Sequence, residues 1–138
     1  MFGANLRGLQ HIGLPVTDIV RSKAFYERLG FVEAMYRELP RRDGIVKVVM
    51  MQLDKLTLEL YQLCGAELEE VRQRRSGHID HVALDVADVD AAFRIVLEEG
   101  WSPLESEPVF LPFWENGVRY FNILGPDGER VEFNQRIV

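Results

Sequence analysis

The sequence predicts an α+β fold of two tandem βαβββ modules. Three observations lead to this prediction: an internal repeat, the same order of alternating and helical apolar patterns in both copies, and the size of the chain. With 138 residues, of which 47% are hydrophobic, the chain can build one ordinary core or two small ones that share an interface. We therefore expect a single domain over residues 1–138, with module 1 at about 7–62, a linker at about 63–77 and module 2 at about 78–138.

The repeat begins with two matching segments that lie 70 residues apart. His11–Asp18 has the sequence HIGLPVTD, and His81–Asp88 has the sequence HVALDVAD. Twelve residues after each aspartate stands a glycine followed by an aromatic residue, at Gly30-Phe31 and at Gly100-Trp101. A match without gaps over about twenty residues indicates two copies of one structural unit.

The ends of the copies also match. Asp54–Leu60 has the sequence DKLTLEL and Asp127–Phe133 has DGERVEF, so a glutamate follows five residues after each aspartate. This offset is 73, which gives the second copy three extra residues. We expect them in the loop Pro108–Gly117.

Module 1 is predicted to contain one helix and four strands, in the order βαβββ. Asp18 is a candidate N-cap, and Gly30 can adopt the positive φ that ends a helix. Short polar turns at 42–44 and 54–55 separate the last three strands. The predicted elements are a strand at about 8–16, a helix at 19–29, and strands at about 31–38, 45–53 and 56–62.

Module 2 repeats this order. Its helix places five apolar residues at the spacing of one buried stripe, namely Val89, Ala92, Phe93, Val96 and Leu97. The predicted elements are a strand at about 78–86, a helix at 88–99, and strands at about 102–109, 117–124 and 130–137. The linker between the modules has room for a short helix.

A histidine occupies the first strand of each module. Because side chains alternate between the two faces of a strand, His11 lies beside Gly13 and opposite the apolar residues of its strand. His81 lies beside Ala83 in the same way. Small neighbours are more typical of a cavity wall than of a filled core. His78 has no counterpart in module 1 and is interpreted as structural or exposed.

A glutamate interrupts the last strand of each module. Glu59 shares its face with Tyr61, and Glu132 shares its face with Arg130 and Asn134. A carboxylate buried without a partner costs several kcal/mol or shifts its pKa. A lone strand histidine is more often a hydrogen-bonded structural residue and a lone strand glutamate more often faces solvent. Since the same pair occurs twice, His11, Glu59, His81 and Glu132 are predicted to bind one divalent metal ion.

Composition excludes several kinds of partner. A formal net charge of -6 argues against nucleic acid and anionic membrane surfaces. No apolar run approaches the roughly 20 residues of a membrane span, and no export signal opens the chain, so we expect a cytoplasmic protein. The single cysteine, Cys64, forms no internal disulfide and is interpreted as a buried or linker thiol rather than a nucleophile.

These residues resemble the vicinal oxygen chelate superfamily, which includes glyoxalase I, fosfomycin and bleomycin resistance proteins, methylmalonyl-CoA epimerase and extradiol dioxygenases. The resemblance rests on His11–Asp18, on Ala24–Gly30 (AFYERLG) and on Gly125–Glu132 (GPDGERVE). It implies an open, cupped, mixed sheet around a metal site, one Ni, Co, Mn, Zn or Fe ion per chain, and a homodimer. The order His, Glu, His, Glu is closest to glyoxalase I.

In this family two neighbouring oxygens of a small-molecule substrate chelate the metal, and a carboxylate moves a proton. The resemblance therefore implies a lyase or isomerase that works through an enediolate, with Glu132 as the first candidate for the base and Glu59 as the second. Glutathione is disfavoured as the thiol, because Pro15 replaces an arginine that pairs with it. Arg74–Gly77 also replaces the Asn-rich stretch that helps these enzymes to hold glutathione, before the second histidine.

Two other functions remain open. The first is an epimerase of an alpha-carboxylated or CoA-linked acid, although Lys47 stands where its acidic catalytic residue belongs and Glu59 replaces a glutamine. Lys47 either holds an anionic group in the cavity or is an exposed strand lysine. The second is a metal-free drug-binding resistance protein, but such proteins usually lack the ligand residues. A fosfomycin enzyme would have a tyrosine in place of Asn122, and extradiol dioxygenases are usually longer.

The remaining pocket candidates are aromatic. Phe113 and Trp114 lie in the apolar loop Pro108–Gly117 and could cap a hydrophobic substrate, make a dimer contact or fold onto the core. Tyr61 is interpreted as core or cavity wall. With Lys47 and Asn122 these residues form the predicted substrate pocket.

Overall fold

The computed structural model describes residues 1–28, 30–74, 79–124 and 130–138. His78 and the segment 125–129 of the glycine-rich motif lie outside these ranges. The chain divides into two compact units, one formed by residues 11–80 and the other by residues 1–10 together with 81–138. Each unit is described by itself.

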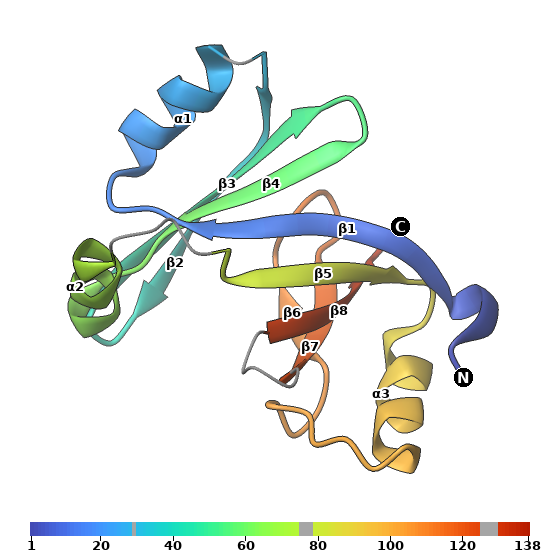
Figure 1. Cartoon of the computed structure of the whole chain (residues 1–138). Coiled ribbons are helices and arrows are strands. Elements are labelled where there is room, and N and C mark those ends of the chain that lie inside the picture. Colours follow the sequence, from blue (N-terminus) through green and yellow to red (C-terminus); the bar gives the residue numbers. More distant parts are fainter. Residues whose placement is uncertain (29, 75–78, 125–129) are drawn as a thin grey trace. The chain divides into compact units, whose positions relative to one another are not determined.

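The unit of residues 11–80 contains the first βαβββ module. Its strands follow the order β2-β3-β4-β1 (Figure 1). β1 is parallel to β4, and the other neighbours are antiparallel. The elements are the end of β1 (Leu6–Pro15), α1 (Ile19–Arg28), β2 (Val32–Arg41), β3 (Gly44–Leu53), β4 (Leu56–Gln62) and α2 (Gly65–Gln73).

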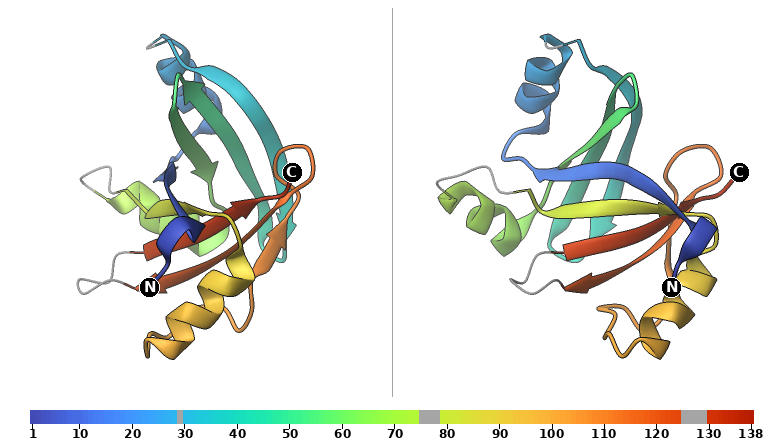
Figure 2. Two further views of the ribbon diagram at one scale, coloured as in Figure 1. Left: turned by 90° about the vertical axis from the view of Figure 1, so that its right-hand side faces the viewer. Right: turned by 45° about the vertical axis from the view of Figure 1, so that its right-hand side comes forward.

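The other unit repeats this arrangement. Its strands follow the order β5-β8-β7-β6, again with the first strand parallel to the last. Its elements are η1 (Gly3–Asn5), the start of β1, β5 (His81–Val86), α3 (Val89–Glu98), β6 (Val109–Leu111), β7 (Val118–Leu124) and β8 (Arg130–Arg136). Figure 2 shows α3 beside β7 and β8. The predicted α+β fold of two βαβββ modules is confirmed.

Each module has a core between its helix and one face of its strands. In the first, Ile19 of α1 packs with Val49 and Leu60, both of which have no exposed side-chain surface. In the second, Phe121 lies edge-on to Phe93 at 5.0 Å and stacks on Phe133 at 4.9 Å between ring centroids. The faces turned away from these cores are therefore available for polar residues.

Both long helices begin in the way that the repeat predicts. The Asp18 carboxylate accepts a hydrogen bond from the Arg21 N–H at 3.0 Å, and the Asp88 carboxylate accepts one from the Ala91 N–H at 2.9 Å. Such N-caps satisfy backbone donors that have no partner inside the helix.

A second, unpredicted element of the repeat supports the same helix ends. The Gln62 side chain accepts a hydrogen bond from the Ile19 N–H at 2.9 Å, and the Gln135 side chain accepts one from the Val89 N–H at 3.0 Å. The two glutamines are 73 residues apart, as are the two glutamates three positions before them. Each last strand therefore turns a glutamine toward its helix and a glutamate toward the other face.

The helices end at Gly30 and Gly100, which have φ values of 99° and 80°. In each case the N–H of the aromatic residue that follows donates to a carbonyl in the last helical turn. Only glycine adopts such φ values without steric cost. The predicted helix ends are confirmed.

The strand predicted at 102–109 is wrong, because β6 covers only Val109–Leu111. Beside β7, the Glu105 carboxylate takes the place of a neighbouring strand. It accepts hydrogen bonds from the Asn122 backbone N–H at 2.7 Å and from the Asn122 side chain at 2.8 Å. The Leu104 N–H donates to the Asn122 carbonyl at 2.8 Å. The backbone groups of β7 at Asn122 therefore find hydrogen-bond partners without a regular neighbouring strand.

Replacing Asp88 with alanine should lower the free energy of unfolding by about 1 kcal/mol, because the first turn of α3 loses its cap. Chemical denaturation followed by circular dichroism measures this change. Asp88→Ser is the control, since serine can also cap a helix and should recover most of the stability. An alanine variant as stable as the wild type would show that the cap contributes nothing to folding.

Candidate metal-binding site

The first candidate pair lies within the unit of residues 11–80. In the parallel pairing of β1 and β4, Gly13 stands opposite Glu59, and His11 lies two residues earlier on the same strand. His11 is 2% exposed, and its Nε2 lies 2.8 Å from Oε2 of Glu59. A buried imidazole and a largely buried carboxylate therefore meet on the face opposite the core.

The second candidate pair lies within the other unit and has the same register. Ala83 of β5 stands opposite Glu132 of β8, and His81 lies two residues before Ala83. Both members of the pair are buried, at 8% and 7% exposure. Nε2 of His81 lies 3.7 Å from Oε2 of Glu132. The structure therefore brings each predicted histidine next to the predicted glutamate of its own module.

Each pair offers one imidazole nitrogen and one carboxylate oxygen. Zinc and similar ions bind such donors at roughly 2.0–2.2 Å, which places two donors of one ion roughly 3–3.5 Å apart. The separations of 2.8 Å and 3.7 Å lie on either side of this spacing. The residues of each pair thus fit the chemistry of a divalent metal ion.

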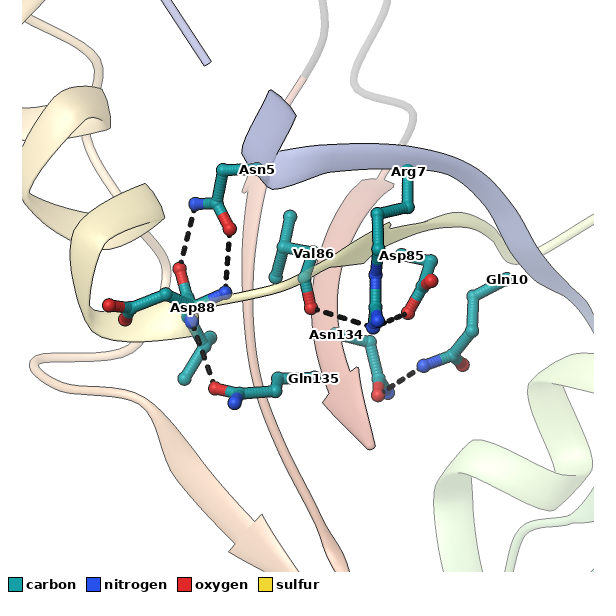
Figure 3. Close-up of polar contacts among 9 residues, drawn as sticks. Asn5, Arg7, Gln10, Asp85, Val86, Asp88, Asn134 and Gln135 are labelled. Carbon is teal, nitrogen blue, oxygen red and sulfur yellow. Dashed lines mark hydrogen bonds and ion pairs between the residues drawn. The ribbon is translucent and has the colours of Figure 1, made fainter. Parts of the chain in front are cut away.

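Two amides next to the second pair were missed by the sequence analysis as site residues. The Asn134 side chain donates from Nδ2 to Oε1 of Glu132 at 2.7 Å. The Gln10 side chain donates in turn from Nε2 to Oδ1 of Asn134 (Figure 3). Asn134 could have been found, because it follows Glu132 by two residues and shares its face. Gln10 could not, because alternation places it opposite His11.

Two of the predicted pocket residues lie on the same strand faces as the glutamates. Asn122 of β7 stands directly opposite Glu132 in the antiparallel pairing and is 6% exposed. Its side chain is held by Glu105. Tyr61 follows Glu59 by two residues on β4 and is buried. Both side chains are therefore buried, each on the strand face that carries the glutamate of its module.

Lys47 does not share the face of Glu59. The residue opposite Glu59 on β3 is Met50, whereas Lys47 stands opposite Gln62. Lys47 lines a cavity of about 390 Å³ beside Ile19 of α1, which is the helix-covered face. Lys47 is half-buried and lies away from the face of Glu59, and its role in holding an anionic group of the substrate stays a prediction.

The two aromatic residues of the loop Pro108–Gly117 differ in burial. Phe113 is 3% exposed, and its role in capping a substrate stays a prediction. Trp114 is partly buried and has a φ of 60°. The guanidinium of Arg136 lies 4.4 Å from its ring centroid. Trp114 is therefore the more exposed of the two aromatic residues.

Cys64 is buried at 8% exposure, as expected for a structural thiol. Burial raises the pKa of the thiol, and so does its hydrogen bond to Asp43. A thiol with a raised pKa is a poor nucleophile. Nothing in its surroundings suggests a catalytic role for Cys64.

Among the helices in the described ranges, none is long and apolar enough to cross a membrane.

Comparisons with known proteins give a family and two relatives. The sequence model of a family described as the glyoxalase/bleomycin resistance protein/dioxygenase superfamily matches residues 10–119. The uncharacterized protein YwbC of Bacillus subtilis is 30% identical over 131 residues, which cover 93% of this chain and 97% of YwbC. YwkD of the same organism is 29% identical over 107 residues, covering 75% of this chain and 78% of YwkD.

Among solved structures, methylmalonyl-CoA epimerase from Mycobacterium tuberculosis has a TM-score of 0.80 at 18% identity, with 100% of this chain and 93% of that chain covered. These values establish a similar fold.

Proposed function

Because this chain belongs to the glyoxalase/bleomycin resistance protein/dioxygenase superfamily, we propose that it is a metal-dependent lyase or isomerase of the glyoxalase I-like type. Its substrate is a small molecule with two neighbouring oxygens, such as a thiol adduct of a 2-oxoaldehyde. One observation carries the proposal. At the equivalent position of both modules, a buried histidine lies next to a glutamate that is itself buried or nearly so.

The proposed metal ligands are His11, Glu59, His81 and Glu132, with one divalent ion per chain from the group Ni, Co, Mn, Zn and Fe. The support comes from the donor types and from the spacing within each pair. Two neutral imidazoles and two carboxylates would balance the charge of a divalent cation. When bound, the ion supplies Lewis acidity that stabilises negative charge on the substrate oxygens.

The carboxylates supply the proton transfer. Glu132, our first candidate for the base, accepts a proton from the carbon beside the substrate carbonyl and returns it to the neighbouring carbon. The electron pair of the broken C–H bond moves into an enediolate and then forms the new C–H bond, while the proton of the substrate hydroxyl passes to the oxygen of the former carbonyl, so no oxidant or reductant is needed. Glu59 is the second candidate. Burial of both carboxylates limits proton exchange with water during this step.

A second candidate is an epimerase of an alpha-carboxylated or CoA-linked acid. It is supported by the similarity in fold to structures named methylmalonyl-CoA epimerase. The proton chemistry is the same, but the proton returns to the carbon from which it came. Lys47, which lies away from the face of Glu59, stays a predicted contact for an acidic substrate group.

Proton NMR in deuterium oxide separates the two reactions. We expect the metal-loaded protein to convert the hemithioacetal of one of several tested thiols into a thioester. Deuterium incorporation next to the carbonyl of an acyl-CoA, without any net change in the thioester, would favour the epimerase. A metal-loaded protein that does neither would support a third candidate, a non-enzymatic small-molecule-binding protein.

We also propose that the protein is a cytoplasmic homodimer, as implied by its resemblance to the family. Light scattering coupled to size-exclusion chromatography tests the assembly. A monomer at all concentrations would contradict it.

A further inference from the structure

We propose that Asn134 is a positioning residue that fixes the carboxylate of Glu132, and that Gln10 in turn fixes Asn134. The inference rests on the proposed function, because it concerns Glu132 as a metal ligand. It adds two residues that neither the repeat nor the family match identifies. All of the contacts involved lie within the unit of residues 1–10 and 81–138.

The first step concerns Asn134 itself. Its side chain is buried at 4% exposure, next to Glu132 at 7%. Nδ2 of Asn134 lies 2.7 Å from Oε1 of Glu132, which is short for a hydrogen bond from an amide to a carboxylate. A hydrogen bond to a charged acceptor in a buried place is stronger than an ordinary one.

The second step concerns the direction of the amide. An asparagine side chain can accept through Oδ1 or donate through Nδ2, and its surroundings decide which end points where. Gln10 donates to Oδ1 of Asn134, as Figure 3 shows. This contact leaves the donating end of Asn134 turned toward Glu132. Gln10 directly precedes the proposed ligand His11, and it orients the asparagine that holds the proposed ligand Glu132.

The third step concerns the two carboxylate oxygens. Oε1 of Glu132 is engaged by Asn134, while Oε2 is the oxygen that lies 3.7 Å from Nε2 of His81. The carboxylate is thus held with one oxygen directed to the histidine. Hydrogen bonds of this kind orient a carboxylate that would serve as a metal ligand.

The equivalent position of the first module carries a different side chain. Tyr61 corresponds to Asn134, 73 residues earlier. An amide therefore stands two residues after the glutamate in the second module, where the first module has a tyrosine.

Metal affinity tests the inference. Replacing Asn134 with leucine keeps the branched shape of the side chain but removes the donor, and we expect about 10–100-fold weaker metal binding, the usual loss when an outer-shell partner is removed. Replacing Gln10 with methionine should cause a smaller loss, because Asn134 remains but is no longer oriented. Dissociation constants for Ni, Co, Mn and Zn are measured by competition with a chromophoric chelator, and melting temperatures are recorded without metal.

Gln135→Met is the matched control. Gln135 lies on the same strand as Asn134 but faces α3, where it accepts a hydrogen bond from the Val89 N–H. Its replacement should lower the melting temperature and leave metal affinity unchanged. Wild-type affinity in a folded Asn134→Leu variant would overturn the inference and leave the proposed function intact. Equal losses of affinity in the Asn134 and Gln135 variants would also overturn it. A wild-type protein that takes up no metal would overturn both.

Discussion

Replacing Glu132 with glutamine should reduce turnover by about 10²–10⁴-fold, the range typical of a lost general acid or base. The substitution keeps the shape of the side chain but removes its charge and its capacity to accept a proton. It also leaves Asn134 Nδ2 facing an amide that offers a weaker acceptor or, if flipped, another donor. Turnover is measured with the hemithioacetal that the wild type converts, at metal concentrations that saturate the variant.

Saturating metal separates the two roles of Glu132. If the glutamine variant regains activity as metal is added, Glu132 acts mainly as a ligand, and Glu59 becomes the stronger candidate for the base. Glu33→Gln is the matched control, because Glu33 pairs with Lys23 on the helix-covered side of the first module. Its turnover should match the wild type. Full activity of Glu132→Gln without added metal would contradict both roles.

Replacing His81 with alanine should abolish activity and weaken metal binding by at least 10-fold, because one of four ligands is lost. Loss of the buried imidazole also removes the proposed metal ligand that lies nearest to Glu132. Isothermal titration with Ni or Zn measures the affinity, and the stoichiometry of binding shows how much of the variant remains competent.

His78 provides the matched control for this substitution. It precedes His81 by three residues and alternation assigns it to the other face of a strand, although it lies outside the described residues. His78→Ala should keep wild-type affinity and activity. Equal losses in the His78 and His81 variants would show that the assignment of faces is wrong.

The fold was predictable because the sequence repeats itself. Asp18 and Asp88, together with Gly30 and Gly100, mark the same helix ends in both copies, and the structure confirms all four positions. Local capping chemistry depends on few residues, so a pattern in the sequence suffices to locate it. The repeat then assigns the strands on either side.

β6 was not predictable in the same way. The repeat predicts a strand at 102–109, but the structure satisfies the edge of β7 through the Glu105 side chain instead. Such a tertiary contact leaves no periodic signal. The side-chain contact between Gln10 and Asn134 likewise joins residues 124 positions apart.

The face on which Lys47 lies could have been predicted from the sequence. The predicted two-residue turn at 54–55 already fixes the register of the hairpin, because Leu53 then pairs with Leu56. Counting back along both strands places Met50 opposite Glu59, as observed. Lys47 is three residues from Met50 and so falls on the other face. The register of a hairpin therefore shows which residues of two neighbouring strands share a face. Composition and the alternation within one strand do not show this.

The most direct test of the central claim is elemental analysis of the purified protein before and after loading with Ni, Co, Mn and Zn. The account predicts about one divalent ion per chain in the wild type and much less than one in a variant that lacks both His81 and Glu132. A protein that contains no ion under any of these conditions would contradict the metal site, and its function would then be sought in ligand binding.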